Sequence, residues 1–330
     1  MMNETTATHI CSRRPKFRVV TDLAGSDATI HFSPEARGLE MDYFETRRAM
    51  IDDHLRAIAD DVAAPEPLDE PLRQSILSVG KRVRGILTLA AGEALGRKPE
   101  QLLDAAAAME MIHTSSLVLD DLPSMDNAVV RRGATALHRQ FGEDLAILTA
   151  VALLNHAYGL VAANHAATRP RRWSAADMVQ RVVDAVGWDG SVAGQSVDLH
   201  SEGSTLDFDT LEFIHSRKTG ALFVAAAAVG AMLANANAAA LRRVEIYAKN
   251  LGLAFQITDD VLDVTSSVAQ LGKDVGKDEQ RLTFVKLAGV DGARKLTAEL
   301  VDTSLAALAP MHGAADPLRA LAVMVRDRVK

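Results

Sequence analysis

The chain has 330 residues, of which 48% are hydrophobic and 24% are charged, and its 36 lysines and arginines against 43 aspartates and glutamates give a formal net charge of −7. This composition predicts a globular protein of one large domain or two ordinary ones. The acidic balance and the 4% aromatic content argue against nucleic-acid binding. A single cysteine, Cys11, excludes an intrachain disulfide and a cysteine-rich zinc site. Because the first twenty residues also lack the pattern of a secretory signal, we expect a cytoplasmic protein.

Residues 1–40 are predicted to be an extension, for which a disordered arm is the favoured interpretation. Weak strand-like alternation occurs at residues 17–20 and 28–32. The first convincing helix is expected to start near Asp42. We therefore predict a single all-α domain over residues 41–330.

Three apolar segments carry the helical pattern most clearly: residues 102–122, 144–167 and 221–263. No proline occurs between residues 171 and 309, so helices can continue there without interruption. Residues 168–173, 201–206 and 265–280 are predicted to be connections. The longest apolar run, Gly220 to Ala234, is shorter than the ~20 residues of a membrane span. We expect a buried helix there and no transmembrane segment, within a large helical bundle.

Two clusters of aspartates each follow a strongly apolar segment. The first aspartate motif is Asp120, Asp121 and Asp126 in LVLDDLPSMD, and the second is Asp259, Asp260 and Asp263 in AFQITDDVLD. Asp259 and Asp263 share a helical face, where their carboxylates repel each other unless a cation lies between them. Carboxylate oxygens with no histidine or cysteine beside them favour Mg²⁺, which prefers to share phosphate oxygens with a substrate. The motifs therefore predict a magnesium site for a diphosphate, whereas a solvated helix end is the ordinary alternative for one such run alone.

Asp120 and Asp126 are six residues apart, which on a straight helix would place them about 120° away from each other. Pro123 is expected to end the hydrogen-bond ladder just after Asp121. The chain could then loop back and return the third carboxylate to the first.

Basic residues lie beside both motifs although the chain is acidic overall. Lys81 and Arg84 in GKRVRG are three residues apart and converge if this segment starts a helix, which suits a second, metal-free diphosphate. His113 lies two helical turns before Asp120 and so on the same stripe. A solvated face for the basic pairs and a core position for the histidine are the ordinary alternatives. Further candidates follow the first motif, precede the alanine-rich run or follow the second motif: Arg131, Arg132, Lys218, Thr219, Lys273 and Lys277.

In this combination and order, the motifs resemble those of the trans-isoprenyl diphosphate synthases, or polyprenyl synthetases, most closely the bacterial geranylgeranyl diphosphate synthases. The resemblance extends from Lys81 to Phe284. It is carried by GKRVR, EMIHTSSLVLDDLPSMDNAVVRRG, HRQFGEDLAILTAVALL, GQSVDLHSEG, RKTGALF, FQITDDVLDV and LGKDVGKDEQRLTFV. One DDxxD alone would be weak evidence, whereas two with these neighbours are specific.

The resemblance implies an all-α isoprenoid synthase-type helical bundle around a central cavity, assembled as a homodimer. It implies a Mg²⁺-dependent head-to-tail (1'-4) condensation of isopentenyl diphosphate with an allylic diphosphate, here farnesyl diphosphate to (all-E)-geranylgeranyl diphosphate, with release of diphosphate. Asp120, Asp126 and Asp259 would hold three Mg²⁺ ions, supported by Asp121, Asp260 and Asp263, and would be catalytic together with Lys218. The allylic diphosphate would be bound by Arg131, Lys218 and Lys273, with Thr219 and Gln256 as further contacts, and isopentenyl diphosphate by Lys81, Arg84, His113 and Arg132.

Product length is expected to depend on the residues that block the cavity beneath Asp120. Ser115 and Ser116 lie five and four residues upstream and are both small. In the family, an aromatic residue five positions before the first aspartate accompanies the shorter farnesyl product, so Ser115 resembles the geranylgeranyl type, and Ser115→Phe or Ser115→Tyr is expected to shorten the product. Two alternatives remain open. Ser115 could face a neighbouring helix, and the floor could be formed deeper, by Met109, Met111 or Ile112.

The chain also departs from the family pattern. Gly85 stands where proline is frequent, Asn127 where an acidic residue is frequent, Thr135 and Ala136 where a Pro-Thr pair is frequent, and Arg281 where lysine is frequent. No departure removes a predicted ligand. The alternatives are a farnesyl or longer-chain synthase, a class I terpene cyclase, which the second DDxxD and the few aromatics disfavour, and a non-catalytic regulatory subunit, which the six retained aspartates disfavour.

Overall fold

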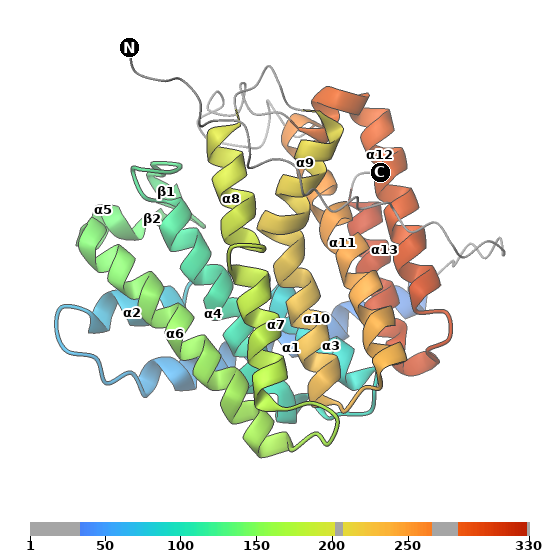
Figure 1. Cartoon of the computed structure of the whole chain (residues 1–330), viewed down its shortest axis with the longest axis horizontal. Helices are drawn as coiled ribbons and strands as arrows, with labels where there is room; N and C mark the ends of the chain where they lie inside the picture. Colours follow the sequence, from blue (N-terminus) through green and yellow to red (C-terminus); the bar gives the residue numbers. More distant parts are fainter. Residues whose placement is uncertain (1–33, 202–206, 266–282, 329–330) are drawn as a thin grey trace, which may run out of the picture. The chain divides into compact units, whose positions relative to one another are not determined.

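Helices hold most of the described residues, as predicted for an all-α chain (Figure 1). The computed structural model describes residues 34–201, 207–265 and 283–328, so the expected strands at 17–20 and 28–32 and residues Cys11, Lys273, Lys277 and Arg281 lie outside it. In chain order the helical elements are α1 Pro34–Asp60, α2 Asp69–Ile76, α3 Val83–Glu93, η1 Pro99–Leu102, α4 Leu103–Asp120, α5 Leu137–Phe141, α6 Glu143–Thr168, α7 Ala175–Val186, α8 Ser191–His200, α9 Phe208–His215, η2 Ser216–Gly220, α10 Ala221–Leu233, α11 Ala238–Thr265, α12 Phe284–Ala307, η3 Gly313–Ala315 and α13 Asp316–Asp327.

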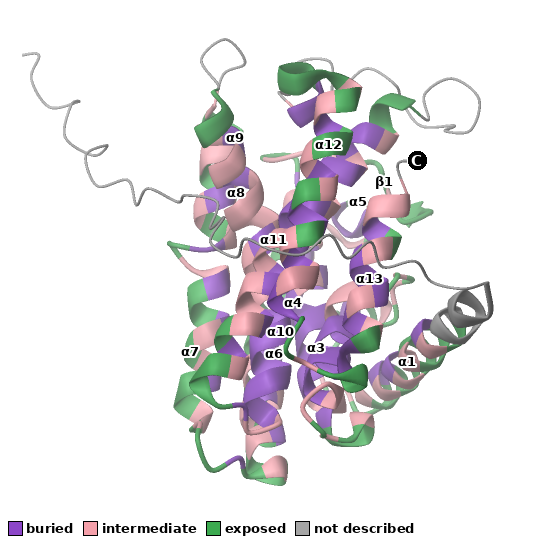
Figure 2. Ribbon diagram, turned by 90° about the vertical axis from the view of Figure 1, so that its right-hand side faces the viewer, coloured by how far each residue is buried: buried purple, intermediate pink, exposed green. Residues whose placement is uncertain are grey.

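Helix α10 lies at the centre of the bundle and packs against α3, α4, α7 and α11. All its residues except Ala221 and Val224 are buried, and Figure 2 shows the same burial along α3, α4 and α10. Its alanines and Gly230 allow this close packing, because a Cβ at Gly230 would overlap the backbone of Thr88 in α3. The expectation that the longest apolar run is a buried helix is therefore confirmed.

Two helix boundaries differ from those predicted. Helix α1 begins at Pro34, eight residues before the predicted start near Asp42. The segment predicted over 221–263 is two helices, since the chain turns between α10 and α11. Asn235 adopts the left-handed conformation there (φ 61°), and the N–H of Ala236 donates to the carbonyl of Ala231. Asparagine tolerates this conformation and ends α10 much as a glycine would.

A short hairpin follows α4 and was not predicted from the sequence. In the described part of the chain, the strands are β1 Val130–Arg131 and β2 Ala134–Thr135, paired antiparallel. Arg132 and Gly133 form the turn with positive φ angles of 52° and 81°. A two-residue turn of this kind matches the twist of the paired strands. The hairpin places Arg131 and Arg132 directly after the first aspartate motif.

Two helices within the described ranges are long and apolar enough to cross a membrane, judged by length and composition alone: Pro99–Asp120 and Glu143–Thr168. The first is mostly buried in the bundle, as a core helix is. The second, α6, is buried over only a third of its apolar window. Its side chains Ile147, Leu148 and Val151 form an exposed apolar face.

Candidate active site

The chain reverses direction immediately after Asp120, as Pro123 predicts. Helix α4 ends at Asp120, and the backbone N–H of Asp126 donates to the carbonyl of Asp120 at 2.9 Å. The N–H of Ala128 donates to the carbonyl of Asp121 at 3.1 Å. These bonds return the third aspartate of the motif to the end of the helix.

Charges around the first motif are only partly balanced by the protein. Burial raises the pKa of Asp120 to about 6; Lys218 and Arg131 oppose this shift, while Asp126 and Asp121 add to it. Asp121 is buried and accepts from Arg131, with Nε at 2.7 Å and a terminal nitrogen at 2.5 Å from Oδ1. The same guanidinium lies 3.8 Å from Asp126. Arg131 therefore fixes Asp121, and Asp120 remains the carboxylate with the most to gain from a further cation.

The three aspartates of the second motif differ in their surroundings. Asp259 pairs with Arg328 at 3.2 Å, and burial raises its pKa against the effects of Arg328 and Lys81. Asp260 points into the protein, where Oδ2 accepts from the N–H of Phe284 at 3.2 Å and burial raises its pKa to about 6. Asp263 lies exposed toward the end of α11. Asp259 and Asp263 thus share the accessible face, as their spacing predicts.

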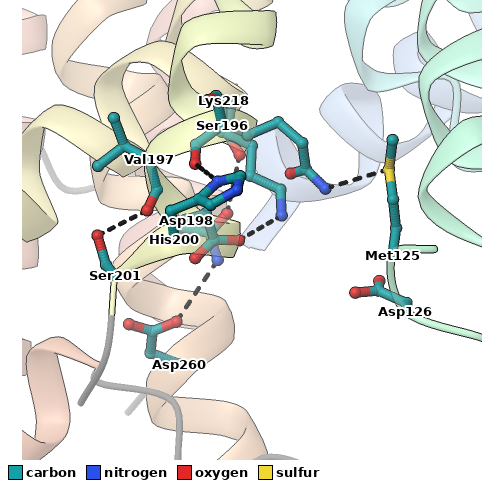
Figure 3. Close-up of polar contacts among 12 residues, drawn as sticks. Met125, Asp126, Ser196, Val197, Asp198, His200, Ser201, Lys218 and Asp260 are labelled. Atoms are coloured by element: carbon teal, nitrogen blue, oxygen red, sulfur yellow. Dashed lines mark hydrogen bonds and ion pairs between the residues drawn. The ribbon is translucent and has the colours of Figure 1, made fainter. Parts of the chain in front are cut away.

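Lys218 and Thr219, which are predicted to bind the allylic diphosphate, lie in a π-helical turn, η2. Its Lys218 ammonium donates to Asp198 of α8 at 2.7 Å (Figure 3). The hydroxyl of Thr219 donates to Oε1 of Gln256 in α11 at 3.0 Å. Gly194 allows α8 to approach this turn, because a Cβ there would overlap the backbone of Lys218. These contacts tie η2 to both α8 and α11.

We call the four residues predicted to bind isopentenyl diphosphate the basic cluster: Lys81, Arg84, His113 and Arg132. Lys81 lies two residues before α3, Arg84 lies in the first turn of α3, His113 lies in α4 and Arg132 lies in the turn of the hairpin. A terminal nitrogen of Arg132 lies 3.1 Å from Nε2 of His113. Burial lowers the pKa of His113 well below its ordinary value, so the neutral ring accepts this hydrogen bond. Burial also lowers the pKa of Arg84 to about 10, and its guanidinium lies over the ring of Phe223 at 5.3 Å. The side chain of Lys81 is exposed.

The two serines predicted to influence product length face different surroundings. Ser115 is buried, and its hydroxyl donates to the carbonyl of Ala150 in α6 at 2.8 Å. Ser116 is partly exposed, and its hydroxyl donates to the carbonyl of His113 at 2.8 Å. Because residues four apart lie above one another on a helix, Ser116 shares the face of Asp120. Ser115 packs against a neighbouring helix, which was the alternative left open by the sequence.

Comparison with known proteins gives the family of this chain. The model of the family described as "Polyprenyl synthetase" matches residues 65–306. The chain belongs to the polyprenyl synthetase family. A dimethylallyltranstransferase of Fischerella ambigua is 41% identical over 294 residues, covering 87% of this chain and 83% of that protein. A geranylgeranyl diphosphate synthase of Cyanophora paradoxa is 40% identical over 292 residues, covering 87% and 95%.

A solved structure gives the same fold for this polyprenyl synthetase. An FPP/GFPP synthase from Zymomonas mobilis superposes with a TM-score of 0.76 and 31% sequence identity, over 87% of this chain and 99% of that one. These relatives are prenyltransferases by name, so the expected enzyme class and the all-α isoprenoid synthase fold are both confirmed. Their printed names differ in product, and product length therefore has to be argued from this chain's own residues.

The carboxylates of this polyprenyl synthetase fit Mg²⁺ by chemistry. They are hard oxygen donors, and the raised pKa of Asp120 marks a buried carboxylate that a cation would stabilise. Over residues 34–201, 207–265 and 283–328, no three potential ligands converge closely enough to hold an ion as they stand. Arg131 engages Asp121 and Arg328 engages Asp259, so these protein cations occupy positions beside the motifs. A bound Mg²⁺ would compete with these two cations for the carboxylates.

Four residues near the site were not assigned a role from the sequence: Glu110, Gln195, Asp198 and Arg328. The amide of Gln195 in α8 lies 3.7 Å from the sulfur of Met125, next to Asp126. Gln195 and Asp198 belong to GQSVDLHSEG, a segment of the resemblance whose polar residues were the available signal. Arg328 comes from the far end of the chain, and no local pattern links it to Asp259.

The raised pKa of Asp120 predicts a pH-dependent effect on stability. A carboxyl whose pKa rises from 3.8 to about 6 on folding stabilises the fold fully below about pH 4, and this contribution is lost as the pH rises through 6. Asp120→Asn removes the titration, so we expect its Tm to increase relative to that of the wild type between pH 4 and 7. Thermal melts followed by circular dichroism in chelator test this, with the exposed Asp302→Asn as control. A Tm difference between Asp120→Asn and the wild type that is independent of pH would contradict the raised pKa of Asp120.

Proposed function

We propose that this polyprenyl synthetase joins isopentenyl diphosphate to an allylic diphosphate at the site between its two aspartate motifs, with farnesyl diphosphate as primer and geranylgeranyl diphosphate as product. The observation that carries the proposal is that each acidic motif lies within electrostatic reach of cations predicted to bind one of the two substrates. Asp120 responds electrostatically to Lys218 and Arg131, while Asp259 responds to Lys81 and Arg328. Arg84 also responds to Asp259, which links the second motif to the cations assigned to isopentenyl diphosphate. A reaction between two diphosphates needs cations for each of them.

Three Mg²⁺ ions bound by Asp120, Asp126 and Asp259 would neutralise the charge that develops on the leaving diphosphate. The chain supplies Arg131 and Lys218 for the same diphosphate, and Asp198 orients the ammonium of Lys218 at 2.7 Å. As the allylic C–O bond breaks, C4 of isopentenyl diphosphate attacks C1 of the allylic cation. The proton lost from C2 of the isopentenyl unit goes to the departing diphosphate, so no side-chain nucleophile is needed.

Release of diphosphate from purified protein tests the reaction type. We expect release to require isopentenyl diphosphate, an allylic diphosphate and Mg²⁺ together. A coupled assay for inorganic diphosphate measures the release. Release from the allylic diphosphate alone would instead support a class I terpene cyclase. Absence of release under all conditions would favour a regulatory subunit.

In this proposal the small side chain of Ser116, on the same face of α4 as Asp120, determines the length of the product. Ser116 leaves room one helical turn from the carboxylate, about 6 Å along the axis. We expect Ser116→Phe to shorten the main product by one five-carbon unit, measured by chromatography of the dephosphorylated products. Ser115→Phe also has to displace α6, because Ser115 is buried against Ala150, so it should lower the Tm more than Ser116→Phe does. An unchanged product in both variants would place the floor deeper, at Met109, Met111 or Ile112.

We further propose that the enzyme is a cytoplasmic homodimer joined through α6. The exposed face of this helix carries Ile147, Leu148 and Val151, with 43%, 54% and 57% of their surface accessible. Along the same face Gly159 has no neighbour within 4 Å of its Cβ position, which allows a second helix to approach closely.

We expect Val151→Asp to convert a dimer into a monomer, measured by size-exclusion chromatography with light scattering. Val183→Asp is the matched control, since Val183 is an exposed valine on α7. A wild-type monomer, or a Val151→Asp variant that remains dimeric, would contradict this interface.

A further inference from the structure

Glu110 is a buried acid for which the proposed reaction gives no role. It lies on α4, three residues before His113, and its side chain is 3% exposed. Oε1 accepts a hydrogen bond from the backbone N–H of Gly85 at 2.8 Å, and Oε2 lies 3.9 Å from a terminal nitrogen of Arg82. A carboxylate buried this deeply is retained only where it has partners of opposite charge.

The partners of Glu110 belong to the segment that carries the basic cluster. Arg82 takes the left-handed conformation (φ 52°), and its guanidinium lies on the same side of Gly80 as that of Arg132, since a Cβ there would be 3.5 Å from the first and 3.1 Å from the second. Its Nε donates to Asp52 of α1 at 2.7 Å, and a terminal nitrogen donates to the carbonyl of Ser78 at 2.7 Å. Its other terminal nitrogen is buried without a hydrogen bond and lies on the side of Glu110. Arg82 thus anchors the loop between α2 and α3, while Lys81 and Arg84 on either side remain in the cluster.

The guanidinium groups of the cluster and of the neighbouring Arg82 repel one another. The charge of Arg132 disfavours the charged form of Arg84, and the charge of Arg82 disfavours that of Arg132. In both cases the largest opposing charge is that of Glu110. Among the described residues, Glu110 is therefore the carboxylate that most offsets the repulsion at both Arg84 and Arg132.

We propose that Glu110 is a positioning residue that holds the basic cluster together before isopentenyl diphosphate binds, with the Gly85 N–H fixing the orientation of its carboxylate. The cluster then presents its cations at the right separation, and the incoming diphosphate does not have to gather them. This inference rests on the proposed function, because it assigns the cluster to isopentenyl diphosphate.

Steady-state kinetics of Glu110→Gln test the role of the charge. Glutamine keeps an acceptor for the Gly85 N–H but removes the negative charge. We expect the KM for isopentenyl diphosphate to rise at least about tenfold, as for loss of one partner of a buried charge pair, while the KM for the allylic diphosphate changes less than about twofold. Glu100→Gln is the control, since Glu100 is exposed in η1.

The conservative variant Glu110→Asp separates the charge from the size of the side chain. Aspartate keeps the negative charge, and we expect its KM for isopentenyl diphosphate to stay closer to the wild-type value than that of Glu110→Gln. A merely structural role predicts the opposite, because aspartate leaves a cavity while glutamine keeps the size of the side chain. In that case the Tm and the amount of active enzyme fall further in Glu110→Asp than in Glu110→Gln.

Variants at Gly85 keep the test decisive if Glu110→Gln does not fold. Gly85→Pro removes the N–H that binds Glu110, whereas Gly85→Ala keeps it. Both variants add a Cβ, which would lie 2.9 Å from the flexible end of Ile51 and 3.2 Å from Cγ of Glu110 and from the carbonyl oxygen of Ala106, so only the N–H differs between them. We expect Gly85→Pro to raise the KM for isopentenyl diphosphate above that of Gly85→Ala. An equal KM in the two Gly85 variants, or an unchanged or lower KM in Glu110→Gln, overturns the inference. Inactive wild-type enzyme would instead refute the proposed function.

Discussion

Asp120→Asn should reduce turnover by about 10²- to 10³-fold or more while the protein stays folded. Asp120 closes α4 at the point where the chain returns Asp126 to it, and its carboxylate is the least compensated of the first motif. Asparagine keeps the shape but cannot supply the charge that binds a divalent cation. Turnover measured at saturating substrates and Mg²⁺ gives the loss.

Folding controls separate this effect from instability. Because burial disfavours the charged form of Asp120, its neutral replacement should melt at or above the wild-type temperature near pH 7. Asp302→Asn, on the exposed face of α12, should leave turnover unchanged. Near-normal activity of Asp120→Asn would refute the metal assignment for the first motif.

Asp259→Asn should have a loss of similar size for the same chemical reason. Asp259 shares the accessible face of α11 with Asp263, and the charges of Arg328 and Lys81 favour its ionised form. A terminal nitrogen of Arg328 lies 3.2 Å from Oδ1 of Asp259. Turnover and Mg²⁺ dependence of the variant measure the contribution of the second motif.

Arg328→Gln distinguishes the carboxylate from its partner. If Arg328 only balances the charge of Asp259, this variant keeps most of its turnover and requires no more Mg²⁺ than the wild type. Equal losses in Asp259→Asn and Arg328→Gln would show that the ion pair matters, and would contradict metal binding at Asp259.

The spacing of apolar residues and the position of Pro123 predicted the helices that carry the first aspartate motif and the reversal of the chain after it. The apolar spacing of residues 102–122 and 144–167 corresponds to α4 and α6, and Pro123 produced the reversal after Asp120. The turn at Asn235 was not predicted, because the apolar pattern continues on both sides of it. The hairpin at Arg132 also escaped prediction, since its strands have two residues each and leave no alternating pattern.

Pairings between distant segments account for most of what the sequence did not show. Lys218 and Asp198 are twenty residues apart on different elements, and Arg328 meets Asp259 from the end of the chain. Glu110 is a single acid inside an apolar helix, where periodicity alone gives it no partner. Which side of α4 faces α6 decides the environment of Ser115, and that depends on packing of the whole bundle.

The size of the product made from labelled isopentenyl diphosphate and farnesyl diphosphate tests the central claim most directly. The purified protein is incubated with both substrates and Mg²⁺, and the dephosphorylated products are separated by chromatography with and without a chelator. The account predicts a twenty-carbon alcohol that disappears when the chelator is present. Failure to extend farnesyl, geranyl or dimethylallyl diphosphate under these conditions would contradict it.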